Sequence, residues 1–245
     1  MIAKTGMAMS SAFHFVTPPH QCAYLPDETA SLEYEGFHAL TAAEYLARME
    51  SGWRRFGRAT FRPRCAACDK CRPIRVDVAR FRPDRSQRRA MKSNDGVVEL
   101  RIGTPSVSRE KLALHDRFHA FQADNKGWPY FGTKDVASYR ESFIANPFPT
   151  QEWYYYLDSR LIGVGYVDDL PGALSAIYFF YDPEVRDRSL GTWNVLKIIS
   201  CAEERSIPYV YLGYYVAGCR SMEYKARFVP NQTMGTDGQW RDFRS

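Results

Sequence analysis

WRRFGRATFRPRCAACDKCRPIRVDVARFRPDRSQRRAMK, residues 53–92, is the stretch that decides how this chain is interpreted. It holds fourteen Arg or Lys residues and three Asp residues, a net charge of +11. The whole chain has 33 basic and 28 acidic residues, so the other residues together carry a net charge of −6. A block of one sign raises the local concentration of anionic partners. Twelve of the fourteen cations are Arg, whose planar guanidinium suits paired hydrogen bonds to phosphate, so we predict a polyphosphate partner.

The basic stretch also has the pattern of a folded segment. Apolar and charged residues alternate over residues 74–78, which is the period of a half-buried strand. Disordered basic tails lack apolar anchors, whereas this stretch contains Trp53, Phe56, Phe61 and Phe81. A solvated basic face with no partner is the alternative that the pattern leaves open.

Length and composition indicate a globular protein. The chain has 245 residues, of which 45% are hydrophobic and 15% aromatic, and disordered chains are poor in aromatic residues. No run approaches the roughly 18 apolar residues that a membrane span requires, and residues 1–16 lack the continuous apolar core of a secretory signal. Six Cys in a chain of this length do not form the framework of a small secreted protein. We therefore predict a cytoplasmic protein.

Apolar spacing and turn residues predict the elements outside the basic stretch. Thr41 and Glu44 form a capping box, and the helix that they begin is expected to end at Gly52. Helical spacing predicts further helices over residues 108–122, 135–144, 189–205 and 219–227. Alternating and apolar runs predict strands over residues 97–102, 152–157, 161–167, 173–181 and 209–214. Residues 1–20 and those from Asn231 onward carry no clear pattern and are expected to be irregular. The fold class is a mixed α/β (α+β) layer.

Four cysteines form a candidate metal site. Cys65, Cys68 and Cys71 are spaced by two residues each, and Cys22 supplies a fourth thiol. Four thiolates are what a tetrahedral zinc ion or an iron–sulfur cluster takes, although a zinc ribbon would usually offer a second CxxC pair in place of a distant fourth ligand. Reduced thiols packed as small apolar side chains are the alternative.

The segment of residues 182–191 links a predicted strand to a predicted helix. The free N–H groups and the dipole at the start of that helix are able to hold a phosphate, and a simple Ser189 helix cap is the alternative. Arg188-x-x-Gly191 matches half of the loop by which acetyltransferases hold coenzyme A, although Trp193 replaces the second small residue. Alternative functions are therefore an acyl-coenzyme A acetyltransferase and a non-catalytic RNA-binding module with a zinc knuckle.

Several motifs, taken together, resemble one protein family. They are Cys22-x-Tyr24-Leu25-Pro26, Gly52-Trp53-Arg54-Arg55-Phe56-Gly57, Phe61-Arg62-Pro63-x-Cys65-x-x-Cys68-x-x-Cys71, Pro73-Ile74-Arg75-Val76, Phe81-x-Pro83-x-Arg85-Ser86-Gln87-Arg88-Arg89, Ser189-Leu190-Gly191, Tyr211-Leu212-Gly213-Tyr214 and Met222-x-Tyr224-Lys225-Ala226-Arg227-Phe228-x-Pro230. In this order the chain resembles the bacterial aspartate/glutamate leucyltransferases, which are relatives of the eukaryotic arginyl-tRNA–protein transferases.

The resemblance implies a GNAT-like acyltransferase domain over residues 106–245 and a smaller basic, Cys-containing region over residues 1–105. It implies transfer of an aminoacyl group, leucyl for a bacterial relative, from aminoacyl-tRNA to the N-terminal amine of proteins that begin with Asp or Glu. Such transfer feeds the N-degron degradation pathway. In eukaryotic relatives the N-terminal cysteines are linked to an iron–sulfur cluster; Cys22 matches one such position, and Leu25 stands where a second Cys would be.

The expected site residues follow from that reaction. Phosphate contacts to tRNA are expected from Arg54, Arg55, Arg62, Arg85, Arg188, Ser189 and Gly191. The cations for the acidic side chain of the acceptor are expected to come from Arg75, Arg88, Arg89 and Lys225. The apolar pocket for the leucyl group is expected at Tyr178, Phe179 and Tyr181, with Tyr211 as a further substrate contact. Asp182 or Glu223 is expected to accept the proton of the amine, and Tyr214 is expected to steady the ester oxygen.

The chemistry itself sets few demands. An aminoacyl ester is already activated, so its attack by an amine is downhill without ATP, and no cofactor is required. The α-amine has a pKa of about 7.7–8.0, so a useful fraction is neutral at cellular pH. Positioning and oxyanion stabilisation are therefore expected to supply most of the catalysis.

Overall fold

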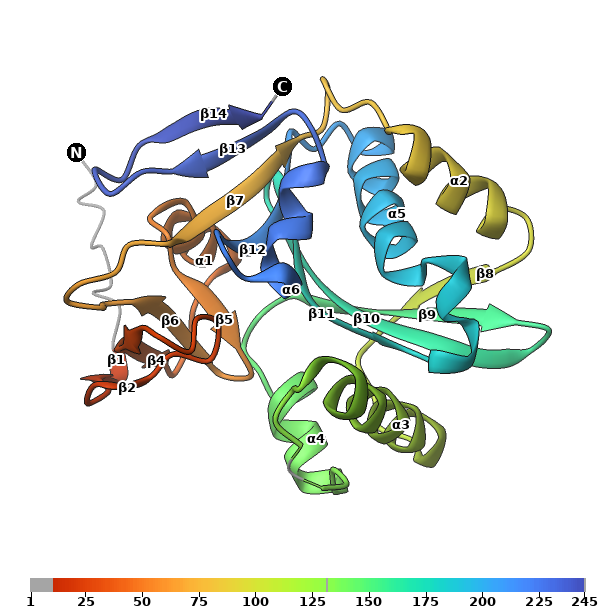
Figure 1. Cartoon of the computed structure of the whole chain (residues 1–245), viewed down its shortest axis with the longest axis horizontal. Helices are drawn as coiled ribbons and strands as arrows, with labels where there is room; N and C mark the ends of the chain where they lie inside the picture. Colours follow the sequence, from red (N-terminus) through yellow and green to blue (C-terminus); the bar gives the residue numbers. More distant parts are fainter. Residues whose placement is uncertain (1–10, 131, 245) are drawn as a thin grey trace, which may run out of the picture.

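The computed structural model describes residues 11–130 and 132–244, and Figure 1 shows their arrangement. A sheet of eight strands forms its centre, in the order β14-β13-β7-β12-β11-β10-β9-β8. Neighbouring strands are antiparallel except for the parallel pair β11 and β12. The strands span Cys71–Asp77 (β7), Glu99–Gly103 (β8), Thr150–Leu157 (β9), Arg160–Leu170 (β10), Ala173–Tyr181 (β11), Tyr209–Val216 (β12), Asn231–Met234 (β13) and Trp240–Arg244 (β14).

A smaller sheet in the order β1-β4-β6-β5 and a short β2-β3 pair complete the strands of the described chain. They span Ser11–Val16 (β1), His20–Gln21 (β2), Thr29–Ala30 (β3), Leu32–Phe37 (β4), Arg54–Phe56 (β5) and Ala59–Pro63 (β6). The helices span Ala42–Glu50 (α1), Arg85–Asn94 (α2), Arg109–Lys126 (α3), Val136–Phe143 (α4), Leu190–Glu204 (α5) and Arg220–Glu223 (α6), with 3-10 turns at Pro183–Arg188 (η1) and Tyr224–Arg227 (η2). None of the helices in this described part has the length and apolar run that a bilayer span needs.

Helices cover both faces of the large sheet. Helices α2 and α5 pack on one face, where α5 buries Trp193 and Leu196 in the main core. Helix α1 contributes Tyr45 and Met49 to a second core on the opposite face, and α3 and α4 form a third core against β10 and β11. Figure 1 shows α2 and α5 on one side of the sheet and α3 and α4 on the other.

The alternation in β7 sends its side chains to opposite faces. Ile74 and Val76 enter the main core below α5, so the period of two in a strand turns Arg75 toward the other face. Both faces are covered, and Arg75 is only 8% exposed. The strand is therefore present as predicted, but the prediction that it is half-buried was wrong, because α1 and the smaller sheet close the second face.

Local sequence signals explain the helix boundaries. The capping box at Thr41 and Glu44 is confirmed, and Gly52 follows α1 with a left-handed φ of +89°, which favours glycine. Helix α2 lies inside the basic stretch, where no helix was predicted, and it begins at a second capping box of Asp84 and Gln87. That signal was present in the sequence, hidden by the density of charge around it.

Two segments expected to be irregular form strands. Residues 11–16 are β1, which pairs with β4, and residues 231–234 and 240–244 form the β13-β14 hairpin beside β7. Strands β1 and β13 are short and pair with segments outside their own neighbourhood, and β14 pairs with β13 across a local turn. Residues 1–10 lie outside the described residues. Strands β7 and β8 share the large sheet with strands from residues 106–245, so both predicted regions contribute to it.

Candidate active site

The parallel strands β11 and β12 separate from each other within the large sheet. They pair at three positions only, from Ala173 with Tyr209 to Ser175 with Tyr211. At that point β12 has an irregularity between Tyr211 and Tyr214 and Gly213 adopts φ +80°. Ser175, at the last pair, has a buried Oγ without a hydrogen-bond partner. We call this parting of β11 and β12 the fork.

Three cations lie beside the β12 arm of the fork, and we call Arg54, Arg75 and Lys225 the fork cations. They come from β5, β7 and η2, so the fold brings together residues that are far apart in sequence. None of them makes an ion pair with a carboxylate within residues 11–130 and 132–244. This is unusual, because buried charges are normally paired.

Arg54 is 4% exposed and only partly satisfied. Its Nη1 donates to the carbonyl oxygens of Trp53 at 2.6 Å and Met49 at 3.2 Å. Its Nε and Nη2 are buried and have no hydrogen-bond partner in the part of the chain that the structure describes. The guanidinium carbon lies 5.3 Å from the ring centre of Tyr211 and 5.5 Å from that of Tyr214. Burial lowers the pKa of Arg54, and the nearby charge of Arg75 adds to the effect.

Arg75 is held flat between rings. Its guanidinium carbon lies 3.7 Å from the ring centre of Tyr209 and 4.3 Å from that of Trp240. Its Nε donates to Oε1 of Gln232 at 2.9 Å, and its Nη1 donates to the hydroxyl of Tyr211 at 3.0 Å. Aromatic faces and neutral oxygens thus orient this cation without neutralising it.

Lys225 has an environment that disfavours its charge. Its Nζ donates to the carbonyl oxygen of Tyr214 at 2.9 Å and lies 3.4 Å from Sδ of Met222. A Cβ on Gly213 would lie 3.6 Å from the same Nζ. Burial, followed by the charge of Arg54, lowers the pKa of Lys225 to about 7. Close to neutral pH, a substantial fraction of this amine is therefore unprotonated.

The arrangement is chemically suited to an anion. Buried donors without partners cost about 1–3 kcal/mol each, and a carboxylate that reaches them recovers this free energy and forms charge-assisted hydrogen bonds. Arg75 and Lys225, both expected from the sequence to meet the acceptor, are thus brought together. Arg88 and Arg89, expected to join them, lie instead on the exposed face of α2.

The carboxylates expected to act as bases are already engaged. Asp182 caps η1 by accepting from the N–H of Glu184 at 3.1 Å, and Arg117 and Arg160 lie 3.2 and 3.5 Å from its Oδ2. Glu223 is exposed and accepts from the N–H of Gly218 at 2.8 Å. Neither carboxylate lies among the fork cations, and we assign neither a catalytic role.

Tyr214 and Tyr211 do lie at the fork. The Tyr214 hydroxyl donates to the carbonyl oxygen of Gly52 at 2.8 Å, and burial raises its pKa. The hydroxyl is thus committed to the backbone after α1, while the Tyr214 carbonyl holds Lys225. Tyr211 accepts from Arg75. Both tyrosines position fork cations, which differs from the expected contact of Tyr214 with an ester oxygen.

The expected leucyl pocket on β11 is divided between the faces of the sheet. Tyr178 packs in the core against α3 and α4, where its hydroxyl lies 3.0 Å from Nε2 of His119. Phe179 packs in the main core on the other side, and Tyr181 stacks on Phe179 with ring centres 5.8 Å apart. Successive residues of a strand point to opposite faces, so these three side chains do not line one pocket.

Two arginines expected to bind tRNA are internally paired. Arg55 forms a buried ion pair with Asp168, with both side chains at most 1% exposed. Arg62 donates to Oε2 of Glu33 at 2.6 Å. Buried Arg55 is therefore not available to phosphates, whereas the tRNA contact expected of part-exposed Arg62 stays a prediction. Both acidic partners are distant in sequence, and only the fold brings them near.

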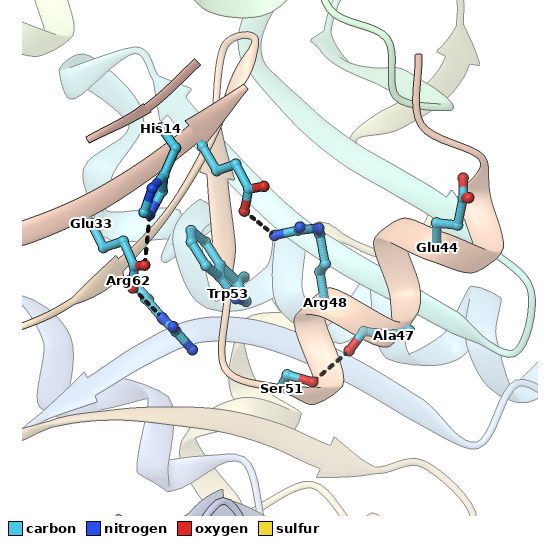
Figure 2. A pocket seen from close by; sticks show the side chains of 9 residues that line it. His14, Glu33, Glu44, Ala47, Arg48, Ser51, Trp53 and Arg62 are labelled. Carbon is cyan, nitrogen blue, oxygen red and sulfur yellow. Dashed lines mark hydrogen bonds and ion pairs between the residues drawn. The ribbon is translucent and has the colours of Figure 1, made fainter. Parts of the chain in front are cut away.

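Arg62 belongs to a pocket of about 670 Å³ beside α1 and β4. Figure 2 shows His14 and Arg62 directed at Glu33, and Ser51 directed at Ala47. Arg48, across the pocket, pairs with Glu35 at 2.7 Å. Two of the three carboxylates that line the pocket are thus paired with its two arginines, and the third, Glu44, accepts from the N–H of Thr41. The residues that line this pocket therefore offer no excess of cations to an anionic substrate.

The open positive surface lies on α2. Arg85, Arg88, Arg89 and Lys92 are exposed and make no ion pair within the described chain. The end of α2 meets the start of α5, where Arg188 donates to the carbonyl oxygen of Ser93 at 2.9 Å and its own carbonyl accepts from Asn94 at 2.8 Å. Ser189 makes no side-chain cap, so it is not the simple helix cap. Exposed Ser189 and part-buried Gly191 thus follow the contact of Arg188 with the C-terminal end of α2.

The candidate metal site groups thiols from two distant segments of the chain, and a bound metal or cluster there stays a prediction. Cys22, Cys65, Cys68 and Cys71 are free and partly buried. Burial, followed by the neighbouring thiols of Cys22, Cys65 and Cys68, raises the pKa of Cys71 to about 12. No group of three or more His, Cys, Asp or Glu side chains among the described residues is arranged to hold a metal ion. We derive no step through a metal.

Sequence reasoning missed the role of Arg54. It treated Arg54 and Arg55 alike, as phosphate contacts, although both lie between the aromatic residues Trp53 and Phe56. That flanking was a signal for burial, because cations between aromatic residues often lie over rings. What no local pattern reveals is that Arg55 has a carboxylate partner and Arg54 does not.

Known protein families and relatives match most of this chain. Residues 110–235 match the family description "Arginine-tRNA-protein transferase, C terminus", and residues 20–89 match "Arginine-tRNA-protein transferase, N terminus". The aspartate/glutamate leucyltransferase of Campylobacter jejuni strain 81-176 is 33% identical over 223 residues, 90% of this chain and 92% of that one. That of Marinobacter nauticus is 35% identical over 231 residues, 93% and 94% of the two chains. That of Pseudomonas fluorescens is 36% identical over 218 residues, 88% and 91%.

Among solved structures, FemX is similar in fold. Its TM-score is 0.50 at 8% sequence identity, and the match covers 89% of this chain and 84% of FemX. At this identity the likeness concerns the fold alone. The mixed α/β, GNAT-like fold class predicted from the sequence is confirmed.

Proposed function

The chain belongs to the arginine-tRNA–protein transferase family of aminoacyltransferases, whose members act on aminoacyl-tRNA and protein N-termini, and from this premise we propose its particular substrates. The donor is leucyl-tRNA, and the acceptor is a protein that begins with Asp or Glu. The names of the similar bacterial proteins support this choice. In this proposal the product carries an N-terminal leucine that feeds the N-degron pathway of the cytoplasm.

The observation that carries the acceptor assignment is the set of fork cations. Arg54 and Arg75 are buried and, among the described residues, neither pairs with a carboxylate, while Arg54 has two nitrogens, Nε and Nη2, without a partner there. An acidic first residue supplies the missing oxygens. An amide in its place, as in Asn or Gln, leaves the cations without a counter-charge, and a site with unpaired polar groups rejects such an analogue strongly.

The donor is proposed to lie along the exposed face of α2. Its four cations are free to reach phosphates, and the start of α5 offers backbone N–H groups beside them. Phosphate contacts fix register without reading sequence. This face therefore suits the tRNA body, while the fork suits the acceptor.

The proposed reaction is aminolysis of an ester. The lone pair of the α-amine forms a C–N bond to the ester carbonyl carbon, and the C–O bond to the terminal ribose breaks. One proton leaves the nitrogen, and the ribose oxygen gains one. Because the ester is already activated, the step needs no cofactor in this proposal, and binding both substrates in one geometry supplies much of the rate.

Purified protein with radiolabelled leucyl-, phenylalanyl- and arginyl-tRNA tests the proposal. The acceptors are peptides that differ only in their first residue: Asp, Glu, Asn, Gln and Ala. We expect leucyl transfer to the Asp and Glu peptides and at least about 100-fold less to the others, since a site built for a charged group rejects neutral analogues. Arginyl transfer in preference to leucyl, or equal use of the Asn peptide, would contradict it.

A further inference from the structure

Lys225 combines three properties that the acceptor-binding role does not explain. It is the only fork cation whose side chain can become neutral near physiological pH, because a guanidinium stays protonated. Its Nζ is fixed at 2.9 Å from the Tyr214 carbonyl oxygen. It also lies beside Gly213, where the backbone of the fork has no side chain. A charge-neutralising role would be served better by a third arginine.

The position of the acceptor amine follows from its covalent structure. In an N-terminal aspartate, the α-nitrogen is separated from the side-chain carboxyl carbon by only two carbon atoms. A carboxylate held by Arg54 and Arg75 therefore leaves its α-amine in the immediate neighbourhood of the cluster. Arg54 is close enough to both Arg75 and Lys225 for their charges to interact, so Lys225 adjoins that position.

We propose that Lys225 is the general base that takes a proton from the attacking α-amine and returns it to the departing ribose oxygen. This inference rests on the proposed acceptor site. After the C–N bond forms, neutral Nζ accepts one N–H proton of the adduct. As the C–O bond breaks, Nζ donates that proton to the ribose oxygen and becomes neutral again, so charge and protons balance within one turnover.

The surroundings of Lys225 suit that cycle. The charged or titratable groups that influence it are Arg54 from β5, Cys219 before α6 and Cys71 from β7. Burial and the Arg54 charge lower the pKa of the free amine to about 7, which is the working range of a general base. When an acceptor carboxylate neutralises Arg54, the repulsion falls and Nζ becomes more basic. Asp or Glu would thereby strengthen the base that acts on its own amine.

The other candidate bases lie away from the fork cations or are already engaged in hydrogen bonds. His119 lies 3.0 Å from the Tyr178 hydroxyl in the core beneath α3 and α4, on the β11 arm of the fork. His115 is stacked on it with ring centres 4.1 Å apart, and burial lowers the pKa of His115 to about 4. Asp182 and Glu223 are engaged as described above.

The decisive comparison is Lys225→Arg with Lys225→Met. If Lys225 only neutralised the acceptor, Arg would restore activity and Met would not. If Lys225 is the general base, both variants should lose about 100-fold or more in kcat, the usual range for general-base catalysis. Lys225→Arg should keep a near-normal KM for the Asp peptide. Lys126→Met, at the exposed end of α3, is the matched control and should retain wild-type kinetics. Recovery of kcat by Lys225→Arg would overturn the proposal.

The pH profile gives a second readout. Below about pH 6.5, log(kcat/KM) of the wild type should rise with a slope near two, since both Lys225 and the free α-amine must lose a proton. In both Lys225 variants the slope should fall to about one, from the α-amine alone. A slope of one in the wild type would count against Lys225.

A direct titration separates this inference from the acceptor assignment. NMR of the lysine side chains in ¹³C,¹⁵N-lysine-labelled full-length protein, with the signal assigned by its loss in Lys225→Arg, should show one amine titrating near pH 7. Addition of an Asp peptide should raise that midpoint, and an Asn peptide should not. A Lys225 midpoint near 10 would contradict the base role whatever the acceptor is. A midpoint near 7 without leucyl transfer would contradict only the proposed substrates.

Discussion

The fork cations and the cations on the exposed face of α2 are in opposite physical situations. Arg54, Arg75 and the α2 cations all belong to the basic stretch of residues 53–92, and the fold adds Lys225 near Arg54. Arg54 and Arg75 are buried, without a carboxylate and partly without hydrogen-bond partners. Arg88 and Arg89 are solvated on α2. A solvated cation binds phosphate weakly, and the binding weakens further as ionic strength rises, whereas a buried unpaired cation binds one shaped anion strongly. Charge density in a sequence therefore predicts an anionic partner but does not tell which cations position tRNA and which select the acceptor.

Arg55 provides the reference for burial with a partner, and it should show the largest effect on stability. Arg55→Met leaves the Asp168 carboxylate buried and unpaired, so the free energy of unfolding should fall by about 3–5 kcal/mol. Urea denaturation measures it. The double variant Arg55→Met with Asp168→Leu should recover most of the lost stability, because removing both charges leaves no buried charge without a partner. A loss below about 1 kcal/mol in the single variant would contradict the buried pair.

Arg54, the next residue, should behave in the opposite way. Arg54→Met removes a cation that has no carboxylate, so stability should change by less than about 1 kcal/mol. Transfer to an Asp peptide should fall by about 100-fold in kcat/KM, within the roughly 2–5 kcal/mol expected when one partner of a buried charge contact is lost. Peptide kinetics and urea denaturation of one sample measure both. If stability collapsed while the folded fraction kept its activity, Arg54 would be a structural residue.

The exposed face of α2 should respond to salt instead of to acceptor identity. Arg88→Ala with Arg89→Ala should weaken tRNA binding and reduce the slope of log K against log[salt] by about two, one for each lost phosphate contact. Stability should stay within about 0.5 kcal/mol, as for other surface changes. Filter binding over a series of salt concentrations measures it.

The matched control for that face is Arg101→Ala, an exposed arginine whose Nε lies 2.7 Å from Glu99 on β8. It should leave the salt dependence unchanged. Wild-type tRNA affinity in the α2 double variant would move the tRNA surface elsewhere, and a change in Asp-over-Asn preference would show that the two regions are not separate sites.

Much of the fold could be predicted because its signals are local. The capping box at Thr41, the helical spacing over 108–122 and the hairpin around residue 158 each depend on neighbours a few residues away, and all three are present. The β13-β14 hairpin was missed because its order comes from pairing with β7.

The site could be predicted only in part, for the same reason. Arg75 and Lys225 were expected to meet the acceptor, and the fold brings them together with Arg54. The difference between Arg54 and Arg55 is that Arg55 pairs with Asp168, which lies 113 residues along the chain from it. The neutral state of Lys225 depends on burial and on Arg54. Such contacts arise from tertiary structure, so composition and spacing cannot supply them.

The smallest expected effects concern the residues that precede α2 and α5, namely Asp84 and Ser189. Asp84 caps α2 by accepting from the N–H of Gln87 at 2.8 Å, so Asp84→Ala should cost about 1 kcal/mol of unfolding free energy. Ser189 precedes α5 with φ +54° and makes no capping bond, so Ser189→Ala should fall within about 0.5 kcal/mol of the wild type. Ser189→Gly should stabilise slightly, because glycine adopts this φ without strain. Thermal denaturation of the three variants measures the order. If Ser189→Ala proved as costly as Asp84→Ala, the start of α5 would be closed by its serine, and its N–H groups would be less available to a phosphate beside the α2 cations.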